Sequence, residues 1–147
     1  MKNLISILLV EDDKDDQEFF IDAINEIDNA HIYDVANNGR EALVKLENPG
    51  SYPDLIFMDI NMPLMGGIEC LTCISQNPQI SNIPVIILSS SIPHIEIVRS
   101  LGARGFMEKP DNGHKLRTQL EVMINTDFMD EWQISNNNFT TMVSSIS

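Results

Sequence analysis

Five short apolar runs divide this chain, and an amphipathic stretch follows each of them. The runs cover residues 4–10, 31–35, 55–58, 85–88 and 106–107. Short runs bounded by turn residues, with apolar side chains in successive positions, are typical of strands that are covered on both faces. The chain is therefore expected to build its core around a buried sheet.

The stretches between these runs have the periodicity of helices. Apolar side chains recur every three or four residues over 15–27, 39–47, 68–74, 97–101 and 116–124, which predicts five amphipathic helices. Strands that alternate with helices at this spacing are joined by right-handed crossovers and form a parallel sheet. The sequence thus predicts an α/β fold with helices on both faces of a five-stranded parallel sheet.

Length and charge exclude several other classes of protein. With 147 residues the chain is expected to form one core. Its formal net charge of −13 repels phosphate backbones, so binding to nucleic acid is not expected. The apolar run 4–10 leads directly into Glu11 and Asp12 without a cleavage site, which favours a buried strand over a signal peptide. We expect a protein of the cytoplasm that does not enter a membrane.

Polar side chains follow four of the predicted strands. They are Glu11 and Asp12 after the first strand, Asp59 and Asn61 after the third, Ser89 after the fourth, and Lys109 after the fifth. Ligands of open α/β sheets bind beyond the carboxyl ends of the strands, so these side chains are expected to meet at one edge. Three carboxylates at one place repel each other, and a divalent cation relieves that repulsion.

The chemistry of this set suggests phosphoryl transfer to an aspartate. Mg²⁺ prefers hard oxygen ligands and commonly combines one or two carboxylates with a phosphate oxygen. An ammonium and a hydroxyl, here from Lys109 and Ser89, can both bind phosphoryl oxygens. An aspartate carboxylate can act as a nucleophile toward phosphorus. The alternative is a set of unrelated helix caps and salt bridges at the strand ends.

Four segments carry a resemblance to a known family: residues 7–13 (ILLVEDD), 54–67 (DLIFMDINMPLMGG), 84–90 (PVIILSS) and the pair Lys109-Pro110. In order and spacing they resemble the receiver domain of two-component response regulators. The match covers roughly residues 4–125. The resemblance implies a flavodoxin-like, three-layer (βα)5 fold with strand order 2-1-3-4-5. It also implies that a histidine kinase or a histidine phosphotransfer protein donates the phosphoryl group.

The resemblance also implies a role for each site residue. Asp59 matches the phosphoacceptor; Asp12 matches the acid that binds Mg²⁺ directly, Glu11 the acid that usually acts through water, and Asn61 the residue whose backbone carbonyl binds the metal. Ser89 matches the switch hydroxyl, Phe106 the switch aromatic, and Lys109 the lysine of the site, with a cis peptide bond expected between Lys109 and Pro110. Asp13 is expected to start a helix, and Asp15, Asp16, Glu18 and Glu26 to form a solvated helix face.

The chain departs from the family pattern in two places. Gly66 replaces the Asp or Asn that is common before Gly67, which leaves two adjacent glycines in the loop. The segment between Ser89 and Phe106 is about two residues shorter than usual and contains Ile92-Pro93. This segment belongs to the usual signalling face of the family.

We expect a receiver domain at residues 1–126, followed by a C-terminal extension at residues 127–147. Nine of the last fifteen residues are Ser, Thr or Asn, a composition typical of a loose tail. We hypothesise that Phe128, Trp132 and Phe139 anchor this extension on the domain or across a homodimer, where it could dock a downstream protein. The extension is too short for an effector domain, so a stand-alone, chemotaxis-regulator-like receiver is expected.

Two alternative functions remain open from the sequence. A Mg²⁺-dependent phosphohydrolase would use Asp59 as nucleophile, but such enzymes usually place a second acid two residues later, where this chain has Asn61. A pseudo-receiver would only bind partners, which the complete set of Asp12, Asp59, Ser89 and Lys109 disfavours. We therefore expect a phosphorylated signalling protein rather than an enzyme with a separate substrate. The Cys70-x-x-Cys73 pair lies within a predicted helix, so Cys70 is expected to pack in the core and the redox-motif spacing of Cys73 is expected to be a coincidence.

Overall fold

The computed structural model describes residues 4–47, 50–90, 95–126 and 140–142. Its strands are β1 (Ile5–Val10), β2 (Ala30–Ala36), β3 (Leu55–Asp59), β4 (Val85–Ser89), β5 (Gly105–Glu108) and β6 (Thr140–Met142). Its helices are α1 (Lys14–Asn25), α2 (Gly39–Lys45), α3 (Gly67–Ser75), α4 (Ile95–Ser100) and α5 (Gly113–Ile124). None of the helices in these ranges has the length and apolar character needed to span a bilayer.

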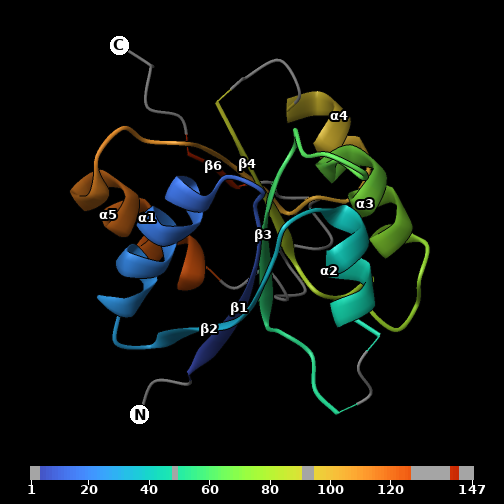
Figure 1. The fold of residues 1–147 in the computed structure, drawn as a ribbon, viewed down its shortest axis with the longest axis horizontal. Helices are drawn as coiled ribbons and strands as arrows, with labels where there is room; N and C mark the ends of the chain where they lie inside the picture. Colours follow the sequence, from blue (N-terminus) through green and yellow to red (C-terminus); the bar gives the residue numbers. More distant parts are fainter. Residues whose placement is uncertain (1–3, 48–49, 91–94, 127–139, 143–147) are drawn as a thin grey trace.

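The strands form a single parallel sheet in the order β2-β1-β3-β4-β5-β6. This confirms the predicted order 2-1-3-4-5 and adds a sixth strand beside β5. Helices α1 and α5 cover one face of the sheet, and α2, α3 and α4 cover the other (Figure 1). The carboxyl ends of β1, β3, β4 and β5 therefore lie at one edge of a three-layer molecule.

Two apolar cores, one on each face of the sheet, explain why the strands are continuous apolar runs in the sequence. Neighbouring residues of a strand point to opposite faces, so Leu9 of β1 packs with Phe20 in the core beneath α1 and α5. Leu8 packs in the other core, which also contains Phe106. The central strands β3 and β4 are buried along their whole lengths. This burial fixes the sheet and with it the positions of the residues that follow each strand.

Helix starts are set by short polar side chains, as the sequence indicates for α1. Asp13 is the N-cap of α1, and its carboxylate accepts a hydrogen bond from the backbone N–H of Asp16 at 2.9 Å. Asn38 and Asn112 cap α2 and α5 in the same way. Gly66 precedes α3 and offers no side chain to cap it. Side-chain caps of this kind contribute about 1 kcal/mol each.

The strand β6 is a feature that the composition of the C-terminal extension does not predict. Thr140, Thr141 and Met142 pair in parallel with Gly105, Phe106 and Met107 of β5. Part of the extension thus packs on its own domain. The predicted anchors Phe128, Trp132 and Phe139 lie outside the described residues.

Ending the chain at Thr126 is expected to increase self-association. An unpaired strand edge offers free backbone N–H and C=O groups to another chain, and this truncation uncovers the edge of β5 that β6 occupies. The weight-average mass from light scattering should rise with concentration for the truncated protein more than for the full chain. Thr141→Pro in the full chain should act in the same direction, because proline is poorly tolerated within strands. Identical masses for all three proteins would contradict this prediction.

Candidate functional site

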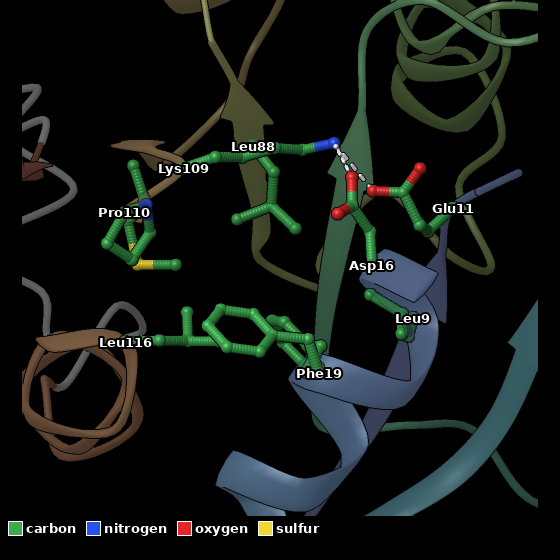
Figure 2. Close-up of a pocket in the computed structure, with 10 residues that line it drawn as sticks. Leu9, Glu11, Asp16, Phe19, Leu88, Lys109, Pro110 and Leu116 are labelled. Carbon is green, nitrogen blue, oxygen red and sulfur yellow. Dashed lines mark hydrogen bonds and ion pairs between the residues drawn. The ribbon is translucent and has the colours of Figure 1, made fainter. Parts of the chain in front are cut away.

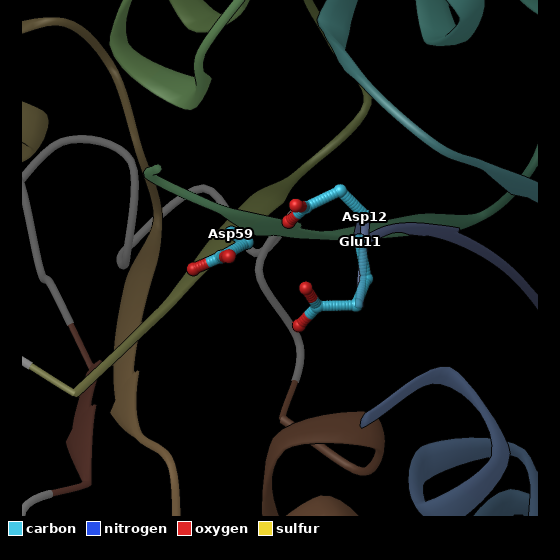
Figure 3. Close-up of side chains that lie close together, drawn as sticks. All are labelled: Glu11, Asp12 and Asp59. Atoms are coloured by element: carbon cyan, nitrogen blue, oxygen red, sulfur yellow. The ribbon is translucent and has the colours of Figure 1, made fainter. Parts of the chain in front are cut away.

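Three carboxylates from two strand ends form the acidic part of the site. Glu11 and Asp12 follow β1, and Asp59 is the last residue of β3. One carboxylate oxygen from each lies within 4.8 Å of the others, and Figure 3 shows the three groups facing a common space. The predicted clustering of these residues is therefore present in the structure.

The three acids differ in burial. The Glu11 side chain is 2% exposed and that of Asp59 is 12% exposed, whereas Asp12 is the most exposed of the three. One oxygen of Asp59 accepts a hydrogen bond from the backbone N–H of Ile60 at 2.9 Å. Glu11 is thus the most deeply buried acid of the cluster, Asp59 is nearly as buried, and Asp12 lies nearest to solvent.

Lys109 supplies the positive charge of the site from the end of β5. Its Nζ lies 2.7 Å from Glu11 Oε1, 3.1 Å from Asp16 Oδ2 and 3.5 Å from Asp59 Oδ2. Figure 2 shows the ammonium joined by dashed lines to both Glu11 and Asp16, with the lysine stem above an apolar pocket. The lysine is therefore bonded most closely to Glu11, and Asp59 is the most distant of its three acidic partners.

The peptide bond between Lys109 and Pro110 is trans, and the expectation of a cis bond is wrong for this structure. The trans form is favoured by about 0.5–1 kcal/mol for a bond that precedes proline. In this conformation the backbone N–H of Lys109 donates to the carbonyl oxygen of Ser89 at 2.9 Å. The lysine reaches the acids without a cis bond.

The remaining predicted residues lie around this cluster. Ser89 is buried at the end of β4, one position beyond Leu88, which pairs with Asp59. Phe106 of β5 is fully buried in the core beneath α2, α3 and α4. Asn61 is exposed in the loop that follows β3. The structure therefore places Ser89 at the same sheet edge as the acids and Phe106 within the core beside it.

Asp16 is a site residue that the sequence reasoning missed. It was expected on a solvated helix face, but it lies in the first turn of α1 and forms an ion pair with Lys109. Its role is not evident from the sequence, because it stands in an acidic run that includes exposed residues such as Asp15 and Glu18. Its position three residues after the N-cap Asp13 was the available signal, since that spacing turns it toward the end of β1.

Burial raises the affinity of the two inner acids for protons. Desolvation raises the pKa of Glu11 to about 7 in spite of its hydrogen bond with Lys109, and the nearby charge of Asp59 adds to this effect. Desolvation also raises the pKa of Asp59, although the positive charge of Lys109 acts to lower it. Burial disfavours the charge of Lys109, but the hydrogen bond with Glu11 and the charge of Asp59 outweigh it and raise the lysine pKa. The site holds more acid than its lysine can neutralise.

Without metal, the stability of the protein is expected to fall as the pH rises from about 5 to about 8. Glu11 has a higher pKa in the folded protein than its ordinary 4.5, so in this range the folded state binds more protons than the unfolded state. Raising the pH then favours unfolding, by on the order of 2 kcal/mol. The raised pKa of Asp59 acts in the same direction.

Urea unfolding in EDTA at several pH values measures this loss. Glu11→Gln removes the titrating group and should flatten the profile between pH 5 and pH 8. A profile of equal slope in the wild type and in Glu11→Gln would assign the effect to other groups.

Cys70 is a packing residue of the core. Cys70 is fully buried on α3, and its burial raises the pKa of the thiol to about 12. A thiol with so high a pKa is a poor nucleophile. Both Cys70 and Cys73 are free thiols; Cys70 is buried, as expected for a core residue, and Cys73 is half-buried.

In a comparison with sequence models of protein families, the model of the response regulator receiver domain matches residues 7–121. The chain belongs to the response regulator receiver family. Membership of this family fits a signalling role that does not require an enzymatic activity of the domain. The match includes Glu11, Asp12, Asp59 and Lys109.

Curated relatives and solved structures agree with this assignment. The response regulator Rcp1 of Synechocystis is 33% identical over 99 residues, which are 64% of this chain and 67% of Rcp1. The probable transcriptional regulator ycf29 of Pyropia yezoensis is 33% identical over 136 residues, which are 88% of this chain and 58% of that protein. The chain thus spans little more than half the length of some of its relatives.

The flavodoxin-like receiver fold is shared with solved response regulators. The phosphorylated cyanobacterial phytochrome response regulator RcpA has a TM-score of 0.74 at 29% identity, over 82% of this chain and 91% of RcpA. The Mn²⁺-bound form of Rcp1 has a TM-score of 0.73 at 26% identity, over 84% of this chain and 96% of that one. Both are proteins that this chain resembles in fold.

Proposed function

We propose that this protein accepts a phosphoryl group on Asp59, in a Mg²⁺-dependent reaction, from a histidine kinase or a histidine phosphotransfer protein in the cytoplasm. The observation that carries the proposal is the position of Asp59. Its carboxylate lies at the end of β3, within 4.8 Å of the oxygens of Glu11 and Asp12 and 3.5 Å from the Lys109 ammonium. A phosphoryl group on Asp59 would thus lie beside both a cation site and a lysine.

The donor set fits a Mg²⁺ ion. Three carboxylates with hard oxygen donors meet here. Burial raises the pKa of Glu11, and the nearby charge of Asp59 adds to this effect, so a bound cation would relieve repulsion between these acids. Asp12, Asp59 and the backbone carbonyl of Asn61 would bind the ion directly, and Glu11 would act through water. Bound Mg²⁺ supplies positive charge shared between carboxylate and phosphoryl oxygens.

The residues of the chain then carry the transfer itself. An oxygen of the Asp59 carboxylate forms a bond to phosphorus while the bond from phosphorus to the donor histidine nitrogen breaks. The released imidazole takes up a proton from water. The N–H groups of Lys109 and the O–H group of Ser89 would bind oxygens of the transferred group.

The output is proposed to be a conformational switch read by another protein. The phosphoryl group adds about two negative charges to the site. We propose that Ser89 moves toward these charges and that Phe106, already buried in this structure, occupies the space that Ser89 leaves. Residues 1–126 would act as the receiver domain. Residues 127–147 would be an extension that binds the downstream protein or a second copy of the chain.

Labelling with acetyl phosphate tests the proposed function. In the presence of Mg²⁺, intact-mass spectrometry should find the mass of one added phosphoryl group, and EDTA should prevent the addition. Turnover of p-nitrophenyl phosphate on the same preparation would instead indicate a phosphohydrolase. A folded protein that binds Mg²⁺ but takes up no phosphoryl group would be a pseudo-receiver, and the proposal would be wrong.

A further inference from the structure

Asp16 is a fourth carboxylate of the site and one of three that form ion pairs with Lys109. Its Oδ2 lies 3.1 Å from Lys109 Nζ, closer than the 3.5 Å that separates the ammonium from Asp59. An ammonium has three protons to donate, and two of them are engaged by Glu11 and Asp16. In the unphosphorylated protein Lys109 is therefore held mainly on the side of α1 (Figure 2).

The backbone beneath Asp16 is firmly connected to the end of β1. The N-cap Asp13 accepts a hydrogen bond from the Asp16 N–H at 2.9 Å. The next residue, Gln17, is buried, and its side-chain amide donates to the backbone carbonyl of Glu11 and to Asn37. These bonds connect the start of α1 to the backbone of Glu11, and the carboxylates of Glu11 and Asp16 both accept hydrogen bonds from the same ammonium.

The carboxylates of Glu11 and Asp16 differ in burial. The Glu11 side chain is 2% exposed and belongs to the acidic cluster, whereas the Asp16 side chain is 47% exposed. The lysine stem lies above a pocket lined by apolar side chains, among them Leu88, Met107 and Leu116. The apolar side chains along the stem offer the ammonium no hydrogen-bond acceptor, so among the described residues its position depends on Glu11, Asp16 and Asp59.

We propose that Asp16 is a positioning residue that, together with Glu11, holds the Lys109 ammonium closer to the start of α1 than to Asp59 before phosphorylation. Asp59 then retains an oxygen for a divalent cation and for the incoming phosphoryl group. Without Asp16, Lys109 pairs more closely with Asp59 and competes with the cation for it. This inference rests on the proposed function and adds to it a residue that acts through Lys109.

Titration of the protein with MgCl₂, followed by amide NMR shifts, tests the role of Asp16. Asp16→Asn is expected to weaken Mg²⁺ binding about three-fold, the scale of a half-exposed ion pair. Asp15→Asn is the matched control, because it removes the same charge one residue earlier from an exposed position of α1. It should change the affinity much less. Asp16→Glu restores a carboxylate and should recover most of the affinity.

A Lys109→Gln background separates positioning from a general field effect. If Asp16 acts through the lysine, Asp16→Asn changes Mg²⁺ affinity in this background no more than Asp15→Asn does. An unchanged three-fold loss in the Lys109→Gln protein, or equal losses for Asp15→Asn and Asp16→Asn in the wild-type background, would overturn the inference. Because Mg²⁺ binding is measured without a phosphodonor, this result is independent of labelling. A protein that binds Mg²⁺ with the expected coupling but takes up no label would refute the proposed function alone.

Discussion

Asp59→Asn is expected to abolish labelling by acetyl phosphate. An asparagine amide has no anionic oxygen to attack phosphorus, whereas the Asp59 carboxylate stands at the end of β3 beside the other acids. We expect the rate of phosphoryl uptake to fall by more than about 100-fold, to the background of the assay. Intact-mass spectrometry over a time course gives both rates.

Asp54→Asn is the matched control for this variant. Asp54 directly precedes β3, at the opposite end of the same strand, where it accepts hydrogen bonds from Ser6. The control makes the same chemical change away from the site and should label at the rate of the wild type. Full labelling of Asp59→Asn, or loss of labelling in both variants, would refute Asp59 as the phosphoacceptor.

The sequence predicted the sheet and the acidic cluster because both follow from local patterns. Buried strands of parallel sheets are continuous apolar runs, and their ends are marked by the first polar residue. Once the runs at β1 and β3 are recognised, topology alone brings Glu11 and Asp59 to one edge. Neither step depends on the details of side-chain packing.

Contacts between elements that are distant in the chain were harder to predict. Asp16 and Lys109 are 93 positions apart, and Asp16 stands in a run of exposed acids that all look alike in the sequence. The strand β6 consists of Thr140, Thr141 and Met142 in a segment of low complexity, and its pairing depends on the free edge of β5. Local periodicity carries no information about such an edge.

The loop after β3 also escaped prediction. Leu64 has a φ of 66° and is 80% exposed. A left-handed backbone is uncommon for leucine, so residue type gives no signal for it. The adjacent glycines 66 and 67 suggest a looser loop from sequence alone, whereas in the structure Gly67 is packed directly against the backbone that carries Asp59.

Gly67→Ala is expected to destabilise the protein by about 3 kcal/mol and to slow phosphorylation of Asp59. A Cβ atom on Gly67 would lie 2.3 Å from the carbonyl oxygen of Asp59 and 2.9 Å from the Cα of Ile60. Both neighbours are backbone atoms, so the strain cannot be relieved by rotating a side chain. The start of α3 or the end of β3 must move, and the second movement displaces the phosphoacceptor.

Gly113→Ala provides a control at an equivalent place. Gly113 is the first residue of α5, as Gly67 is of α3, but a Cβ on Gly113 would meet only the ring of Phe19 at 3.5 Å, an ordinary contact. We expect this control to be neutral or slightly stabilising. Thermal unfolding should show a melting temperature about 10 °C lower for Gly67→Ala, and acetyl phosphate labelling at a temperature where both variants are folded should be slower for Gly67→Ala alone. Equal melting temperatures for the two variants would show that α3 can shift without loss of stability, and would contradict the first part of the prediction. A destabilised Gly67→Ala protein that labels normally would show that α3 moves while Asp59 stays in place, and would contradict the second part.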